Sequence, residues 1–428
     1  MKTFIQHQIT KKAKKILSIY KPLIITVSGS VGKTSTRNAI AKVLSAKYRV
    51  GTTIKNYNNE FGVPLTILGS ESPGKSFFGW LKILCSKPSS VPEIFVLEYG
   101  IDHPGDMKQL CEIATPDISV MTRLSPVHAE HFRSLEQLAE EKAMMLECTK
   151  PDGLVLLNAD DHLVLGIQGH ARAPIVTYGF SAHAQVRASD YQLETREDFS
   201  FEPGELFSTI HAQVKMQDQS LIDIELKNML GQTCVNALLP ALIIAKRLNL
   251  SQEEIISSLA AIVFEPGRMN PIPGIKGSLL IDSSYNAAPA SMFAALEVLS
   301  AFHPVEKARR IAVLGHMAEL GGYREQEHRM LGMRVAELGI DLLVTVGDMT
   351  REIRHAAIEA GISQEQAHHF DTPVQAGRWL DGQVRKGDVV LIKGSQSARM
   401  EKIVKDLMAE PLRASELLVR QSKEWEMV

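Results

Sequence analysis

Cysteine is scarce in this chain of 428 residues, and the spacing of its four cysteines suggests no shared role. Cys85, Cys111, Cys148 and Cys234 are far apart and include no Cys-x-x-Cys pair. This pattern argues against a metal site built from cysteines, and we expect reduced, buried thiols. A disulfide staple is not needed, because a chain of this length can form two or three domains with cores of their own.

The sequence also lacks a marked net charge and a secretion signal. Its formal net charge is −2, so the whole molecule has no electrostatic preference for nucleic acid, and we predict no nucleic-acid partner. The first twenty residues contain neither a long apolar run nor the small-residue cleavage site of a secretory signal. We therefore predict a cytoplasmic protein.

The N-terminal segment, residues 1–22, has apolar residues at helical spacing with lysines between them, which predicts a basic amphipathic helix. We expect this helix to pack on the next domain. A sharper alternative is weak attachment to an anionic membrane surface. Residues 76–85 (Ser-Phe-Phe-Gly-Trp-Leu-Lys-Ile-Leu-Cys) favour that alternative, since they are aromatic and lack acidic side chains. They are too few to cross a bilayer.

A glycine loop at residues 29–35 (Gly-Ser-Val-Gly-Lys-Thr-Ser) joins an apolar strand to a helix. The first glycine of the full P-loop consensus is absent, because Val27 stands in its place. We nevertheless interpret the loop as a phosphate cradle. Its backbone N–H groups and the helix N-terminus suit an anion, Lys33 neutralises charge, and Thr34 can hold Mg²⁺. The alternative is a plain strand-to-helix turn.

Apolar runs of strand length alternate with helical patterns along most of the chain, which predicts an α/β protein. We expect a P-loop-type, mainly parallel central sheet domain, followed by a second Rossmann-like α/β domain. Between about 177 and 227, segments in which apolar and polar residues alternate predict a small antiparallel addition. A Pro-Gly pair in the linker 264–268 suggests the boundary. The predicted domains are the helix at 1–22, a central ATP-binding domain at 23–264 and a C-terminal domain at 265–428.

Two candidate metal ligands follow predicted strands that neighbour the glycine loop. Glu98 ends the run 94–97, and His128 lies a few residues after the run 118–122. The carboxyl ends of parallel strands meet at one edge of a sheet, so both side chains can face the loop. An acid near a phosphate loop holds Mg²⁺ or its water, and a neutral imidazole can complete the shell. His128 alone could equally be an ordinary hydrogen-bonded histidine.

Taken in order, the motifs resemble the Mur ligase family, most closely the branch that adds D-alanyl-D-alanine to the muramoyl tripeptide. The similar segments cover most of the chain. They are residues 29–35, 56–64 (Asn-Tyr-Asn-Asn-Glu-Phe-Gly-Val-Pro), 98–105 (Glu-Tyr-Gly-Ile-Asp-His-Pro-Gly), 128–132 (His-Ala-Glu-His-Phe) with Lys142, 282–289 (Asp-Ser-Ser-Tyr-Asn-Ala-Ala-Pro), 314–321 (Leu-Gly-His-Met-Ala-Glu-Leu-Gly) and 393–397 (Lys-Gly-Ser-Gln-Ser).

This resemblance implies an ATP- and Mg²⁺-dependent amide ligase of peptidoglycan precursor synthesis that forms an acyl phosphate. It implies a peptide or nucleotide-sugar peptide as acceptor and an amino acid or dipeptide as donor. The implied catalytic residues are Lys33, Glu98, His128 and Lys142, and the implied Mg²⁺ ligands are Thr34, Glu98, His128 and a carbamylated Lys142. The implied nucleotide contacts are Gly29, Ser30, Gly32, Lys33, Thr34, Ser35, Asn236 at adenine, Arg268 at the γ-phosphate and Asp282 at the ribose.

Several of these residues also have ordinary structural explanations. Without the resemblance, Lys142 would be read as a solvated charge on a helix. Asp282 would be read as a turn residue before a helix.

The sequence departs from the family pattern in two ways. The family places a nucleotide-sugar-binding domain ahead of the ATP loop, whereas here the loop begins at residue 29. His316 and Ser283 replace aspartates, and Gln232 replaces a histidine. Three alternatives therefore stay open: an unusual mode of UDP-sugar binding, a partner that supplies the missing domain, or a different acceptor without UDP. A catalytically silent ATP-binding scaffold subunit is an alternative of another class.

Overall fold

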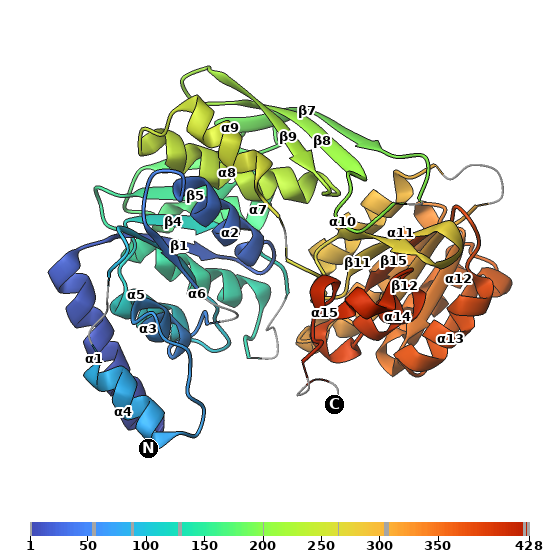
Figure 1. Cartoon of the computed structure of the whole chain (residues 1–428), viewed down its shortest axis with the longest axis horizontal. Coiled ribbons are helices and arrows are strands. Elements are labelled where there is room, and N and C mark those ends of the chain that lie inside the picture. Colours follow the sequence, from blue (N-terminus) through green and yellow to red (C-terminus); the bar gives the residue numbers. More distant parts are fainter. Residues whose placement is uncertain are drawn as a thin grey trace.

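The computed structural model confirms the α/β class and contains two sheets, each with helices on both faces (Figure 1). We call the first sheet with its helices the first lobe and the second sheet with its helices the second lobe. The described residues are 2–53, 57–86, 90–126, 131–199, 201–263, 265–303, 308–422 and 425.

The first sheet has the strand order β2-β3-β1-β4-β5-β6-β7-β8-β9. Pairing is parallel from β2 through β7 and antiparallel among β7, β8 and β9. The predicted antiparallel addition thus extends the parallel sheet. The strands are β1 Leu23–Ser28, β2 Val50–Thr52, β3 Ile94–Glu98, β4 Ile118–Met121, β5 Leu154–Asn158, β6 Ile175–Gly179, β7 Val186–Thr195, β8 Ser208–Lys215 and β9 Leu221–Lys227.

The central strand β1 is apolar on both faces because helices cover both. Ile25 and Val27 pack with α2, α8 and α9, while Ile24 packs with α1, α3, α5 and α6. The helices of this lobe are α1 Lys2–Tyr20, α2 Lys33–Leu44, α3 Gly62–Ile67, α4 Phe77–Cys85, α5 Asp106–Ile113, α6 Leu135–Cys148, α7 His162–Gly166, α8 Gln232–Arg247 and α9 Gln252–Ala260.

Helix α1 packs on the first lobe, as the sequence predicts. Its buried residues Ile9, Ala13 and Ile16 recur at helical spacing and join the core beneath that face of the sheet. None of the described helices is both long enough and apolar enough to cross a membrane.

The expectation of four buried thiols is wrong for Cys85. All four cysteines are free; Cys111 and Cys234 are buried and Cys148 is half-buried, but Cys85 is exposed. The reason is that Ile83 is the one fully buried residue of α4, so the opposite side of this helix faces solvent.

The second sheet has the strand order β10-β11-β15-β12-β13-β14, and its pairs are parallel except for β10. Strand β10 contains Pro271 and Pro273, which an edge strand tolerates because it has one partner. The domain boundary at residue 264/265 remains a prediction. The strands are β10 Asn270–Gly274, β11 Ser278–Ser283, β12 Arg310–Gly315, β13 Leu342–Val346, β14 Ala367–Phe370 and β15 Val389–Lys393.

Helices also cover both faces of the second sheet. One face packs with α10, α11 and α12, and the other with α13, α14 and α15. These helices are α10 Pro289–Ser300, α11 Arg324–Glu337, α12 Arg351–Glu359, α13 Pro373–Gln383, α14 Glu401–Leu407 and α15 Ala414–Leu417.

The far end of the antiparallel strands reaches the second lobe. In Figure 1, β7, β8 and β9 extend from the first lobe toward α10. Phe201, Phe207 and Leu230 belong to the same buried cluster as Leu296 and Leu299 of α10. This apolar contact joins the lobes in addition to the linker.

Candidate active site

The glycine loop lies against the carboxyl end of β4 and allows no side chain at its first position. A Cβ on Gly29 would lie 2.1 Å from the Thr122 hydroxyl oxygen, and Gly29 has a φ of 142°. The Thr122 hydroxyl donates to the carbonyl oxygens of Ser28 and Val31 at 3.1 and 2.7 Å. The loop therefore has a fixed shape, and α2 begins directly after Gly32 with its first N–H groups unpaired within the helix.

The Glu98 carboxylate is buried at the end of β3, where three side chains contact it. The Thr34 hydroxyl donates to Oε2 at 2.9 Å, Arg37 Nη1 lies 3.3 Å from the same oxygen, and Asn58 Nδ2 donates to Oε1 at 3.1 Å. Glu98 is 4% exposed. Sequence analysis missed Arg37 and Asn58, although Arg37 follows Thr34 at the i+3 spacing that places it on the same helix face.

A half-buried lysine, Lys33, and a buried lysine, Lys142, meet at the carbonyl oxygen of Gly29. Lys33 Nζ donates to it at 2.9 Å, and Lys142 Nζ on α6 donates to it at 3.0 Å. Burial lowers the pKa of Lys33, although the negative charge of Glu98 acts in the opposite direction. Burial and the positive charge of Lys33 together lower the pKa of Lys142 well below the usual lysine range. Lys142 is 1% exposed, so the interpretation as a solvated helix charge is wrong.

The histidine motifs are described in part. His128 lies outside the described residues. His103, just before α5, stacks on His131, just before α6, with ring centroids 4.3 Å apart. Two segments that are well separated in the sequence therefore present imidazoles side by side, and both rings belong to exposed residues.

Asn236 lies on α8 next to the carboxyl end of β5. Its Nδ2 donates to Asp160 Oδ2 at 2.8 Å. Asp160 also accepts from the backbone N–H groups of Phe180 and Ser181. Asn236 Oδ1 is buried and has no hydrogen-bond partner among the described residues, which leaves an acceptor available to a ligand.

Glu265 of the linker contacts both Arg268 and helix α2. Glu265 accepts from Asn38 Nδ2 at 3.0 Å, and its carboxylate lies 3.6 Å from Arg37 Nη2 and 3.5 Å from Arg268 Nε. The Arg268 guanidinium stacks over the Tyr285 ring at 4.1 Å, and its charge contributes to the lowered pKa of Lys33. Residues of both lobes thus meet beside α2.

Asp282 and Lys393 lie at the carboxyl ends of adjacent strands β11 and β15. Asp282 is fully buried, and burial raises its pKa to about 6. Lys393 Nζ donates to Ser283 Oγ at 3.0 Å and to the carbonyl oxygen of Asn286 at 2.9 Å. Burial, with a contribution from Arg268, lowers the pKa of Lys393 to about 7. Asp282 Oδ1 also accepts from the backbone N–H of Ser284 at 3.0 Å, so the turn contact of the ordinary structural explanation is present at this buried position.

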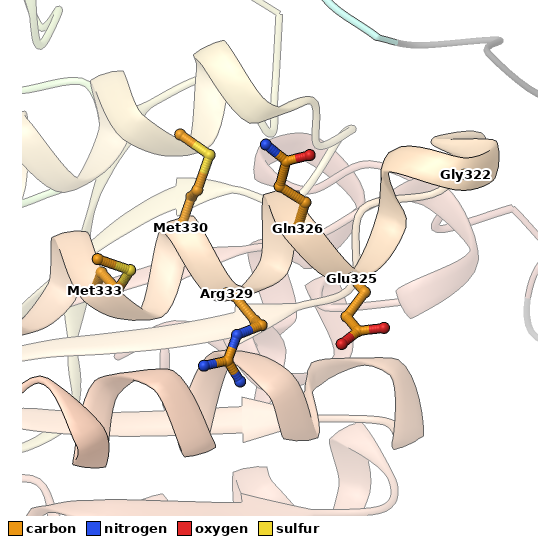
Figure 2. A pocket seen from close by; sticks show the side chains of 6 residues that line it. All are labelled: Gly322, Glu325, Gln326, Arg329, Met330 and Met333. Atoms are coloured by element: carbon orange, nitrogen blue, oxygen red, sulfur yellow. The ribbon is translucent and has the colours of Figure 1, made fainter.

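A shallow pocket elsewhere contains none of these residues. Figure 2 shows it on α11, with Met330 and Met333 on the helix and Gly322 at the preceding turn. Arg329 points toward α12, where it pairs with Glu352 and Glu359.

Comparison with known proteins gives consistent matches along the chain. The Mur ligase middle domain matches residues 27–239, and the glutamate ligase domain of Mur ligases matches residues 267–396. A UDP-N-acetylmuramoyl-tripeptide--D-alanyl-D-alanine ligase from Bacillus subtilis is 29% identical over 94% of this chain and 79% of the relative. The protein of the same name from Mycobacterium tuberculosis is 30% identical over 90% of this chain and 73% of the relative.

The solved structures include a MurF ligase from Thermotoga maritima in complex with ADP. It superposes with a TM-score of 0.75 and 25% identity, over 94% of this chain and 83% of that chain.

The titration of Lys393 gives a stability prediction. Folded Lys393 loses its proton at about pH 7, whereas an unfolded lysine keeps it to 10.5. Between these values the unfolded state binds more protons, so this group makes the free energy of unfolding rise with pH. We expect Lys393→Met to remove that rise in urea unfolding at pH 7, 8 and 9. Lys405→Met, at an exposed lysine of α14, is the control and should keep it. Equal pH slopes for wild type and Lys393→Met would contradict the prediction.

Proposed function

Because the chain belongs to the Mur ligase family, we propose that it adds D-alanyl-D-alanine to UDP-N-acetylmuramoyl tripeptide, with ATP as the energy source. The observation that carries this proposal is the group formed around the glycine loop by the half-buried Lys33 and the buried Thr34, Glu98 and Lys142. The names of the relatives supply the two substrates. We place the reaction in the cytoplasm, where ATP is available.

The proposed reaction has two steps. A carboxylate oxygen of the acceptor attacks the γ-phosphorus of ATP, and ADP leaves. The amine of the donor then attacks the acyl carbon, and phosphate leaves as the amide forms. Negative charge builds up around the transferred phosphoryl group, so fixed cations are required there. We assign Lys33 and the amides of Gly29, Ser30, Gly32 and Ser35 to the β- and γ-phosphates, and Arg268 to the γ-phosphate.

The oxygens beside the loop fit Mg²⁺. The Thr34 hydroxyl and the Glu98 carboxylate lie 2.9 Å apart in a buried setting, and both are hard oxygen ligands of the kind that Mg²⁺ prefers. When bound, Mg²⁺ would neutralise phosphate charge. We propose that Thr34, Glu98 and His128 hold it, with the carbamate of Lys142 as a further ligand.

The remaining nucleotide contacts are also part of the proposal. The free acceptor Asn236 Oδ1 supports a contact with the adenine amino group. Asp282 Oδ2 is buried without a hydrogen-bond partner among the described residues, which supports a hydroxyl contact at the ribose. A partner that supplies a nucleotide-sugar-binding domain remains a prediction.

The substrate assignment is tested by product formation. With ATP, UDP-N-acetylmuramoyl tripeptide and D-alanyl-D-alanine together, we expect ADP, phosphate and the amide product in equal amounts, measured by phosphate release and mass spectrometry. Omitting either substrate should stop product formation. Equal use of a short free tripeptide would favour an acceptor without UDP, and ATP binding without any product would favour the scaffold alternative.

Lys33 is tested against a lysine of the same helix. We expect Lys33→Ala to lower acceptor-dependent phosphate release by about 10²- to 10³-fold, because an electrostatic contact to the transferred phosphoryl group is lost. Binding of the acceptor should persist in calorimetry. Lys42→Ala, at an exposed position of α2, should retain activity. Full turnover by Lys33→Ala would show that the loop is assigned wrongly.

The lowered pKa of Lys142 favours its neutral amine, which is the form that reacts with CO₂. We expect a carbamate resonance in the ¹³C NMR spectrum of the protein in ¹³C-bicarbonate, and its loss in Lys142→Gln. Lys108→Gln, at an exposed lysine of α5, should keep the resonance. A signal that survives in Lys142→Gln would place the carbamate elsewhere.

A further inference from the structure

Helices α1 and α4 lie side by side at the outer edge of the first lobe (Figure 1). Both helices have exposed aromatic and basic side chains. We propose that this face docks on an anionic phospholipid bilayer. We call it the α1–α4 surface, and it consists of Phe4, Lys11, Lys14 and Lys15 of α1 with Phe77, Phe78, Leu81 and Lys82 of α4.

The exposed residues of α4 form one face of the helix. Phe77, Phe78 and Leu81 are 63%, 80% and 47% exposed and lie at positions i, i+1 and i+4. The opposite face carries Trp80 and Ile83, which pack against the core of the first lobe. Packing within this chain therefore does not account for three large apolar side chains on the outer face of a nine-residue helix.

The charge of this region has a single sign. No aspartate or glutamate occurs among the first 59 residues, although the whole chain has a net charge of −2. Lys11, Lys14 and Lys15 are exposed on α1 at spacings of three and four residues, and so share a face. Residues 72–86, which contain α4, also lack acidic side chains. Helices α1 and α4 thus contain basic but no acidic side chains, in a nearly neutral molecule.

The two helices are held together in this arrangement. Lys12 Nζ donates to the carbonyl oxygens of Ile83 and Leu84 at 2.5 and 3.2 Å, and also to that of Ser86, at the end of α4. Trp80 Nε1 donates to the carbonyl oxygen of Gly74 at 3.0 Å, which fixes the segment leading into α4. The α1–α4 surface is therefore preformed, and binding requires little ordering of the chain.

The lysines and exposed phenylalanines of the α1–α4 surface suit a lipid bilayer better than a second copy of the chain. A bilayer with anionic headgroups offers negative charge at the surface and an apolar layer just below it, which suit lysines and exposed phenylalanines respectively. A second copy of the same surface would bring lysines against lysines. Because no described helix can cross a membrane, the contact is with the membrane surface. Helix α1 passes through Lys21 and Pro22 directly into β1, so binding would also orient the strand that carries the glycine loop.

The test is vesicle flotation with the full chain. We expect the protein to float with vesicles of phosphatidylcholine and phosphatidylglycerol at low salt, to be released by high salt, and to remain unbound with phosphatidylcholine alone. Combining Lys11→Glu, Lys14→Glu and Lys15→Glu should lower the partition coefficient at least about tenfold, since each lysine near an anionic surface contributes to binding. Combining Phe77→Ser and Phe78→Ser should weaken binding at low salt, because the apolar contacts with the acyl layer are lost.

Matched controls lie in the second lobe. Leu412→Ser removes an apolar side chain that is 97% exposed, and Lys405→Glu reverses an exposed lysine, so neither should alter flotation. All variants change exposed residues, and unchanged melting temperatures would confirm that they fold. A second measurement places a reporter on the outer face of α4: brominated lipids should quench the tryptophan fluorescence of Phe78→Trp more strongly than that of the wild type, in which Trp80 lies on the packed face.

Three outcomes would overturn the proposal. The first is no flotation with anionic vesicles at low salt. The second is flotation that the lysine and phenylalanine variants leave unchanged. The third is a lipid-independent dimer that Phe77→Ser and Phe78→Ser dissociate, since this would make a second copy the occupant.

Discussion

The buried carboxylate of Glu98 is the constraint on which the rest of the site depends. A charge at the end of a central strand is costly unless it is neutralised and hydrogen-bonded, and Thr34, Arg37 and Asn58 do this together. Two of these partners lie on α2, so satisfying the carboxylate also sets the position of the helix. The glycine loop, which lies between β1 and that helix, is positioned as a result.

The same group of charges connects the lobes. Arg37 contacts Glu98 on one side and Glu265 on the other, and Glu265 in turn contacts Arg268. Arg268 stacks on Tyr285, which follows β11. Three ion pairs and one contact between a guanidinium and a ring therefore connect Glu98 in the first lobe with Tyr285 in the second, close in sequence to the buried Asp282.

The sequence predicted the elements with strong patterns. Continuous apolar runs identified the central strands, and periodicity identified α1 because its buried residues recur at helical spacing. Strand β10 was missed since its two prolines are poor strand formers that only an edge position tolerates. Arg37 and Asn58 were missed because their role depends on which elements meet at Glu98. Lys142 could be singled out only by family resemblance, since its burial under the loop leaves no local signal.

The described residues join the two lobes through contacts of different kinds: the charged contact at Glu265, the apolar contact of Phe207 and Leu230 with the helices of the second lobe, and a hydrogen bond from Arg413 Nη1 to the carbonyl oxygen of Pro203. Moving the lobes apart would break these contacts together. Any exchange of substrates that requires such a movement should therefore be a cooperative step and not a gradual loosening.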